Sequence, residues 1–103
     1  MTESEFLDVS DAVFAQIEMA LDEVEFDVDT LRAGNVLEIE FEDGSKVIVN
    51  RHAANQEIWL AARSGGYHYR LKDTQWINTR GDGELYADVA TAISAHAGAA
   101  FHF

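Results

Sequence analysis

The chain has 103 residues, with 19 Asp and Glu against 7 Lys and Arg, which gives a formal net charge of −12. This charge excludes direct binding to nucleic-acid phosphates or to anionic lipid, whereas a basic protein surface is a suitable partner. Nearly half of the residues are hydrophobic, so residues 1–103 are of a size and composition for one folded domain rather than a disordered acidic tail.

Cysteine is absent, so the chain cannot hold an iron–sulfur cluster or a thiolate zinc site with its own side chains. Any metal chemistry must use carboxylates and imidazoles. The sequence shows no basic start followed by an apolar run, and no stretch approaches membrane-spanning length. We therefore expect a soluble cytoplasmic protein.

From about residue 4 to residue 24 the apolar residues recur at helical spacing, which predicts an amphipathic helix. Ten of the 19 acidic residues lie in the first 29 positions, and no Lys or Arg precedes Arg32. These ten are Glu3, Glu5, Asp8, Asp11, Glu18, Asp22, Glu23, Glu25, Asp27 and Asp29. We expect them to project together into solvent as a ridge that attracts metal ions or a basic protein surface.

Two features indicate that this ridge is more than a solubilising surface. Asp22 and Glu23 fall in the last turn of the predicted helix, where the helix dipole disfavours anions by roughly 0.3–1 kcal/mol each. Glu18 and Asp22 are like charges one turn apart, which adds repulsion. Carboxylates suit hard cations such as Fe²⁺, Fe³⁺, Mn²⁺ and Ca²⁺, and the lack of a dedicated cage predicts modest affinity.

The middle of the chain changes to a period of two. Leu37, Ile39 and Phe41 alternate with glutamates, which predicts a half-buried strand that turns at residues 42–45 and returns over residues 46–50. The other predicted strands are 27–33, 58–62, 67–71 and a short edge strand at 75–78.

A second helix is predicted to begin near Gly83 with Asp82 as its cap, and to stop at Gly98. The order helix, antiparallel meander, helix predicts an α+β fold, a two-layer α/β sandwich with both terminal helices on one face of the sheet. The other face is expected to be open to water. Strand parity places Asn50, Trp59, His68 and Arg70 on that open face, where an exposed Trp is a candidate contact residue.

Catalytic motifs are absent from the sequence. The four histidines show no paired metal-ligand spacing, and no nucleophile, phosphate-binding or zinc-protease motif is present. We therefore expect a protein that is not an enzyme.

Several segments, taken together and in this order, resemble the signature strands of the bacterial frataxins, the CyaY-type proteins. They are Ser4-Glu5-Phe6, Gly44-Ser45-Lys46-Val47-Ile48-Val49-Asn50-Arg51, Ile58-Trp59-Leu60-Ala61, Gly65-Gly66-Tyr67-His68-Tyr69 and Trp76-Ile77. The resemblance spans nearly the whole chain. His52 and Glu57 depart from it, since they stand where the family commonly has Gln.

The resemblance implies a frataxin-like fold and an iron-binding, non-catalytic regulator of iron–sulfur cluster assembly. The carboxylates that it implies as ligands of weakly bound Fe²⁺ or Fe³⁺ are Glu18, Asp22, Glu23, Glu25, Asp27 and Asp29. The residues that it implies in partner binding are Asp11, Glu18, Asp22, Glu23, Asn50, Trp59 and His68. The partner would be a cysteine desulfurase, docked at the ridge, with the cluster scaffold protein as a further candidate near the open sheet face.

Two other functions remain open from the sequence. One is iron oxidation or storage, although the Glu-x-x-His pair of di-iron bundles is absent. The other is metal-independent inhibition of a basic protein by the acidic ridge. We expect a monomer, with iron-dependent oligomerisation left open.

Overall fold

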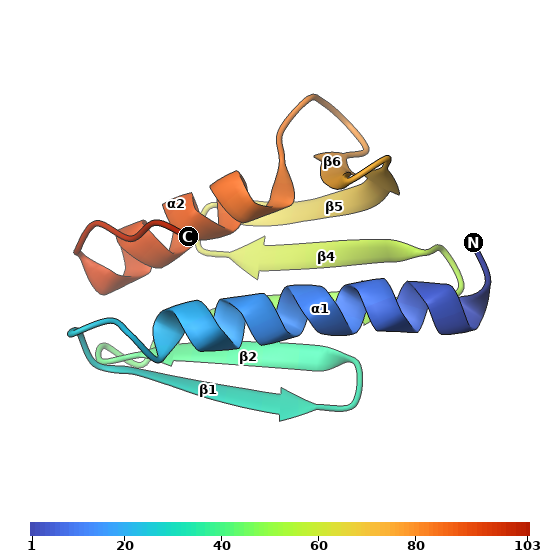
Figure 1. The fold of residues 1–103 in the computed structure, drawn as a ribbon. Coiled ribbons are helices and arrows are strands. Elements are labelled where there is room, and N and C mark those ends of the chain that lie inside the picture. The colour runs from blue at the N-terminus through green and yellow to red at the C-terminus, as the bar shows by residue number, and fades with distance from the viewer.

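The computed structural model describes residues 1–103 and contains two helices and six strands (Figure 1). In chain order these are α1 (Glu3–Leu21), β1 (Val28–Ala33), β2 (Val36–Phe41), β3 (Lys46–His52), β4 (Glu57–Ala62), β5 (Gly65–Lys72), β6 (Gln75–Asn78) and α2 (Leu85–Ala97). Both helices pack on one face of the sheet, so the predicted two-layer α+β sandwich is confirmed.

Helix α1 begins with a capping box. The Thr2 hydroxyl accepts from the Glu5 backbone N–H at 3.1 Å, and the Glu5 carboxylate accepts from the Thr2 N–H at 2.8 Å. This interaction holds the pKa of Glu5 below its usual value. The helix ends at Leu21, earlier than the predicted residue 24, because Asp22 is its C-cap and Val24 already lies in the connection to the sheet.

The sheet is a meander of six antiparallel strands in the order β1-β2-β3-β4-β5-β6. The β2–β3 hairpin turns at Gly44, whose φ of 84° is accessible to glycine at little cost. Register pairs Leu37 with Val49 and Ile39 with Val47, so each strand alternates between the helix-covered face and the open face. The predicted strands and their parity are confirmed, with β3 extending to His52.

Helix α2 begins later than predicted. Glu84, not Asp82, is the N-cap, and its carboxylate accepts from the N–H groups of Tyr86 and Ala87. The cause is strand pairing: the Asn78 N–H donates to the Gly83 carbonyl at 2.7 Å, and Glu84 still bridges to Ile77. At the other end Gly98 adopts a φ of 67° and closes the helix as predicted.

One hydrophobic core of 19 buried residues lies between the helix layer and the sheet. Its large, fully buried side chains include Phe6, Phe14, Tyr69 and Ile93. The Tyr69 hydroxyl donates to the Asp88 carboxylate at 2.6 Å, which ties β5 to α2, and burial with this bond raises the pKa of Tyr69. Because both helices cover the same face, the opposite face of the sheet is left without a covering layer.

No helix reaches the combination of length and apolarity that a bilayer crossing requires.

Candidate functional site

Five exposed carboxylates follow one another where α1 leads into β1. We call them the free carboxylate row: Asp22, Glu23, Glu25, Asp27 and Asp29. Val24, Phe26 and Val28 alternate with them and pack against the core, so the carboxylates between them are turned to solvent. None of the five forms an ion pair within the chain. The predicted concentration of uncompensated charge is therefore present in this segment.

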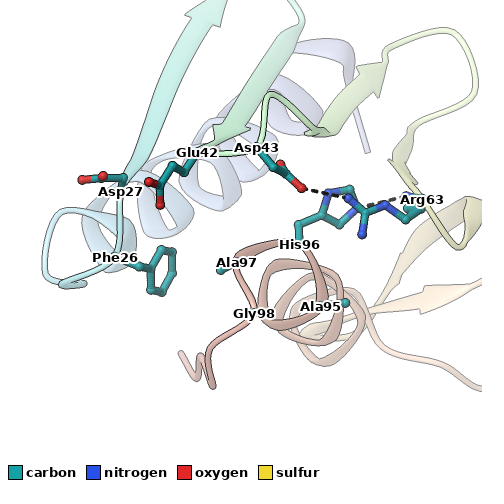
Figure 2. Close-up of a pocket in the computed structure, with 9 residues that line it drawn as sticks. All are labelled: Phe26, Asp27, Glu42, Asp43, Arg63, Ala95, His96, Ala97 and Gly98. Atoms are coloured by element: carbon teal, nitrogen blue, oxygen red, sulfur yellow. Dashed lines mark hydrogen bonds and ion pairs between the residues drawn. The ribbon is translucent and has the colours of Figure 1, made fainter.

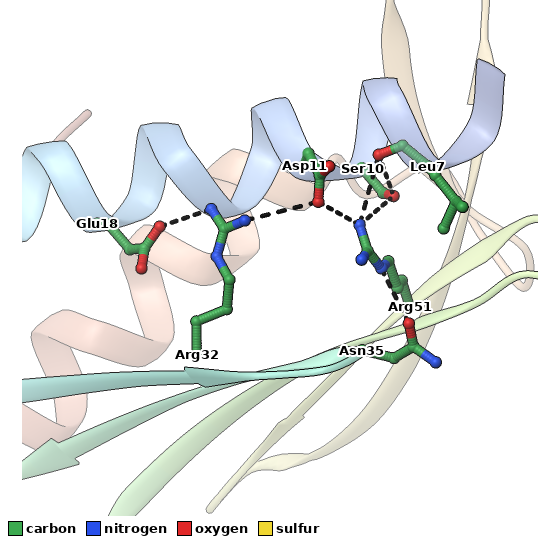
Figure 3. A network of polar contacts seen from close by, with 7 residues as sticks. All are labelled: Leu7, Ser10, Asp11, Glu18, Arg32, Asn35 and Arg51. Atoms are coloured by element: carbon green, nitrogen blue, oxygen red, sulfur yellow. Dashed lines mark hydrogen bonds and ion pairs between the residues drawn. The ribbon is translucent and has the colours of Figure 1, made fainter. Parts of the chain in front are cut away.

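The same prediction is wrong for Asp11 and Glu18, which we call the paired carboxylates. Figure 3 shows Arg32, from β1, reaching α1, with its Nη2 atom 2.7 Å from Glu18 Oε1 and its Nη1 atom 3.5 Å from Asp11 Oδ1. Arg51, from β3, donates to Asp11 as well. The ridge expected from the sequence is thus neutralised at Asp11 and Glu18 and free beyond the end of the helix, while Glu3 and Asp8 near its start also form no ion pair.

The Arg51 side chain is the more deeply placed of the two, with an exposed fraction of 12%. Its guanidinium also donates to the Leu7 carbonyl, the Ser10 hydroxyl and the Asn35 side chain (Figure 3). Both guanidinium groups lie over the Phe14 ring, at 5.3 Å for Arg32 and 5.4 Å for Arg51. Strand parity is the sequence signal that places both arginines against α1. Arg32 pairs with Leu37 and Arg51 with Ile58, on the helix-covered face.

The free carboxylate row continues onto the neighbouring strand. Asp29 lies directly opposite Glu40 in the β1–β2 ladder, a like-charge pair that disfavours the native sheet. Asp27 and Glu42 line a hollow of about 500 Å³ between this strand end and the last turn of α2 (Figure 2). Glu40 on β2 and Glu42 in the turn that follows it therefore add further negative charge beside the row.

The third carboxylate of that hollow, Asp43, is bound within the fold. It accepts from the Ser45 hydroxyl at 2.6 Å. It also accepts from Arg63 at 3.2 Å (Figure 2), and these bonds lower its pKa. Ser45 also contacts His96 Nδ1 at 2.9 Å, while His96 Nε2 accepts from the Arg63 backbone N–H at 3.1 Å. Burial and the nearby Arg63 hold the pKa of His96 below its usual value.

The carboxylates do not form a ready-made metal cage, since no three His, Asp or Glu side chains converge on one point. Their hard oxygen donors fit ferrous or ferric iron. Each ion would be held by one or two of these carboxylates, with water completing its coordination. That arrangement fits weak binding with little selectivity between hard cations.

A second candidate surface lies on the open face of the sheet. Asn50, Trp59 and His68 occupy one row across β3, β4 and β5, because Asn50 pairs with Trp59 and Trp59 with His68. The predicted outward row is confirmed. The Trp59 ring is stacked between two imidazoles, with ring centroids 3.7 Å from His52 and 3.9 Å from His68. His52 was not predicted at this surface, and it reaches Trp59 along a diagonal of the sheet.

Glu57 holds this stack through a hydrogen bond to Trp59. It is a buried carboxylate with a relative exposure of 7%, although its strand position faces outward. It accepts from Trp59 Nε1 at 3.0 Å and from Arg70 Nε at 3.1 Å, and His68 Nδ1 lies 3.7 Å away. No local pattern indicates this role, because an outward Glu on an open sheet normally remains in water.

The family model for the frataxin-like domain matches residues 1–99. The chain belongs to the frataxin family. It is 60% identical over 103 residues to the iron–sulfur cluster assembly protein CyaY of Chromobacterium violaceum, covering 100% of this chain and 98% of that protein. It is 49% identical over 100 residues to the protein of the same name from Neisseria meningitidis, covering 97% and 94%.

Solved frataxins have the same fold. Frataxin from Psychromonas ingrahamii superposes with a TM-score of 0.92 at 31% identity, covering 99% of this chain and 97% of that one. Yeast frataxin superposes with a TM-score of 0.62 at 22% identity over 89% of this chain and 80% of that chain, which shows similarity of fold alone.

This frataxin-family chain presents two separate surfaces. The free carboxylate row brings together five of the six carboxylates that the sequence analysis named as metal ligands, and the sixth, Glu18, is bound by Arg32. The open face brings together Asn50, Trp59 and His68 with Arg70, as strand parity predicted, and adds His52 and Glu57 to them.

Proposed function

We propose that this chain regulates iron–sulfur cluster assembly by binding iron weakly at the free carboxylate row and by docking that row on a basic surface of a cysteine desulfurase. Its membership of the frataxin family, and relatives named as iron–sulfur cluster assembly proteins, support a role in that pathway. The protein acts in this role without catalysing a reaction of its own. The cluster scaffold protein is the further candidate partner.

The observation that carries the proposal is the absence of any ion pair along the free carboxylate row. The carboxylates of the row repel one another along the chain and across the Asp29–Glu40 pair. An external cation bound at the row would reduce this repulsion in the folded protein. Asp11 and Glu18 would take a smaller part in docking than expected from the sequence, because Arg32 and Arg51 already compensate them.

Iron and desulfurase would use the same carboxylates, so each should weaken the binding of the other. Attraction between the exposed row and a basic surface is screened by salt, because the Debye length falls to about 8 Å at physiological ionic strength. Docking should therefore weaken steeply as salt is raised, mainly through a slower association rate.

The test is charge reversal in the row. Asp22→Lys with Glu23→Lys should reduce affinity for the desulfurase by at least about tenfold, which is about 1.4 kcal/mol. The matched control is Glu3→Lys with Asp82→Lys, which changes the charge by the same amount at two exposed positions outside the row. Titration calorimetry at two salt concentrations measures both variants, and equal losses of affinity would contradict the proposal.

Metal-independent inhibition of a basic partner is a second candidate function. It is supported by the way the carboxylates spread along the surface without converging in threes. Anaerobic Fe²⁺ titration of the desulfurase assay separates the two functions. An effect of the chain on desulfurase activity that changes with iron concentration supports iron regulation, whereas an effect independent of iron supports the second candidate. Saturable, stoichiometric oxidation of Fe²⁺ would instead support iron oxidation or storage.

A further inference from the structure

Two hairpin turns and the last turn of α2 meet at one imidazole, beside the hollow of Figure 2. His96 is buried, with a relative exposure of 8%, and its ring lies 5.3 Å from that of Phe41. Its Nδ1 atom is 2.9 Å from the Ser45 hydroxyl in the β2–β3 turn (residues 42–45). Its Nε2 atom is 3.1 Å from the backbone nitrogen of Arg63 in the β4–β5 turn (residues 63–64). One side chain of α2 therefore holds both turns.

The partners of the ring define where its proton lies. A backbone N–H can only donate, so the Nε2 atom of His96 accepts from Arg63 and carries no proton. The proton of the neutral ring is therefore on Nδ1, which donates it to the Ser45 oxygen. The Ser45 hydroxyl in turn donates to Asp43 at 2.6 Å. Every group in this chain of bonds thus has a partner of the opposite kind.

We propose that His96 is a pH-dependent latch, which holds the β4–β5 turn on α2 while its ring is neutral and releases that turn, but not the β2–β3 turn, when its ring is protonated. The latch requires neither iron nor a desulfurase. It therefore stands or fails independently of the proposed function.

Protonation reverses the chemistry of only one of the two contacts. A proton on Nε2 turns this acceptor into a donor, so it and the Arg63 N–H would be two donors facing each other, and their hydrogen bond is lost. The contact from Nδ1 to Ser45 survives, because Nδ1 is a donor in both charge states. The Asp43 carboxylate bonded to Ser45 also attracts the imidazolium. The release is therefore one-sided.

The β4–β5 turn has little else to hold it on the helix layer. Its other side-chain bond to a different element is the ion pair of Arg63 with Asp43, in which both side chains are more than half exposed, so solvent screens it. Within the hairpin, the Tyr67 hydroxyl bonds Ser64 at 3.2 Å, and Ala62 pairs with Gly65. The hairpin itself should therefore remain formed when its turn separates from α2.

The surroundings of His96 keep the latch closed at neutral pH. Burial is the largest influence on the pKa of His96 and lowers it, the Arg63 guanidinium lowers it further, and Asp43 raises it. Asp27 and Glu42 line the same hollow but form no hydrogen bond with the ring. The pKa in the folded protein is therefore below the usual value of about 6.5, and release begins only as the pH falls below that value.

The main test follows the wild-type protein by NMR from pH 7.5 to pH 5. The protection factor of the Arg63 amide, corrected for the pH dependence of intrinsic exchange, should fall by at least about tenfold as the His96 ring titrates. The Gly44 amide is the internal control, because it donates to the Phe41 carbonyl within the β2–β3 turn at 2.9 Å. Its protection should change by less than about twofold.

Three results of this titration would overturn the latch. One is an Arg63 amide whose protection is unchanged while His96 titrates. Another is a His96 ring that stays neutral down to pH 5. The third is an equal loss of protection at Arg63 and Gly44, because it would indicate general loosening of the fold instead of one-sided release.

The tautomer of His96 at neutral pH is a separate test. The chemical shifts of the two ring nitrogens distinguish a proton on Nδ1 from a proton on Nε2. Free histidine favours the form with the proton on Nε2, whereas we expect His96 to carry it on Nδ1 because the Arg63 N–H occupies Nε2. A proton on Nε2 at neutral pH would overturn the latch.

Variants assign the transition to His96. His96→Gln should make the Arg63 amide resonance independent of pH between 7.5 and 5, and a transition that persists in it would overturn the latch. The matched control is His102→Gln, which removes an exposed histidine and should leave the transition as in the wild type. Arg63→Gln keeps the backbone N–H and should raise the midpoint, whereas Asp43→Asn should lower it. Midpoints that move in the opposite directions would contradict the electrostatic control described here.

Discussion

The two halves of the N-terminal acidic segment differ in whether the fold provides ion-pair partners for them. Along the body of α1, Asp11 and Glu18 are bound by Arg32 and Arg51, which come from strands far along the sequence. Beyond the helix, the free carboxylate row has no such partner. In sequence both halves look alike, since neither contains a Lys or Arg. The structure divides them into a part that stabilises the fold and a part that is available for binding.

The difference shows that charge density in a sequence does not measure charge available for binding. Each compensating arginine lies on a strand at an inward position, so its guanidinium emerges at the edge of α1 and meets the nearest carboxylates. The connection from Asp22 to Asp29 passes beyond the reach of these two side chains. Function at this surface therefore depends on which carboxylates the sheet leaves uncompensated.

The largest expected effect concerns the arginine that binds the paired half. Arg51→Met keeps the apolar stem over Phe14 but removes the bonds to Leu7, Ser10, Asn35 and Asp11. We expect a loss of about 2–3 kcal/mol in the free energy of unfolding, measured by urea denaturation. Arg63→Met is the control and should cost much less, because Arg63 and its partner Asp43 are both well exposed. Equal costs would contradict a structural role for the paired half.

The next effect concerns the hollow of Figure 2, which holds both paired and unpaired carboxylates. Asp43 is bound within the fold there, whereas Asp27 and Glu42 are free. The pKa of His96 is lowered in the folded protein, so the unfolded chain binds the proton more readily. Its contribution to stability should be complete at neutral pH and be lost as the pH falls below about 6.5.

We expect this loss to be at most about 1.4 kcal/mol per pH unit, since one proton is involved. Urea denaturation of wild type and His96→Gln between pH 7.5 and pH 5 measures it as the difference in slope between the two proteins. The comparison with His96→Gln removes the contribution of the many carboxylates that titrate in both. Parallel pH profiles would show that the His96 contact with Arg63 and Ser45 does not favour the neutral imidazole.

A smaller effect is expected from neutralising the paired carboxylates. Asp11→Asn with Glu18→Gln should lower the free energy of unfolding by about 1 kcal/mol, because both acids are partly exposed and solvent screens their ion pairs. Thermal and urea denaturation give this value. An increase in stability would mean that Arg32 and Arg51 do not compensate these two side chains.

The smallest effect should have the opposite sign. Asp22→Asn with Glu23→Gln removes negative charge at the C-terminal end of α1, where the helix dipole opposes it and no basic residue lies in the last turn. We expect a gain of about 0.3–1 kcal/mol in the free energy of unfolding. A loss equal to that of the Asp11 and Glu18 variant would erase the difference between the two halves.

Local pattern was enough to predict most of the fold. Alternation along β2 and the helical spacing of α1 identified the buried faces, and Gly44 and Gly98 marked a turn and a helix end that both require positive φ. The start of α2 was wrong because a strand-like pairing of Gly83 and Glu84 with β6 delays the helix. Such pairing is tertiary and leaves no periodic signal.

The candidate surfaces were predicted less completely. The open-face row of Trp59 and His68 followed from parity alone, whereas His52 and Glu57 join it through a diagonal contact and through burial by their neighbours. Strand parity indicates that Arg51 faces the helices, but its contact with Asp11 joins residues 40 positions apart, so no local pattern identifies the partner. Contacts of this kind depend on how the helix layer is placed over the sheet.

The most direct test of the central claim is anaerobic Fe²⁺ titration followed by backbone NMR of the wild type, of Asp22→Asn/Glu23→Gln and of Asp11→Asn/Glu18→Gln. In the wild type, paramagnetic broadening should begin at residues 22–29 and 40–42, before it reaches residues 8–18. The Asp22 and Glu23 variant should require more iron for the same broadening, and the Asp11 and Glu18 variant should respond like the wild type. Broadening centred on Asp11 and Glu18, or equal in all three proteins, would contradict the claim that the free carboxylate row is where this chain attracts cations.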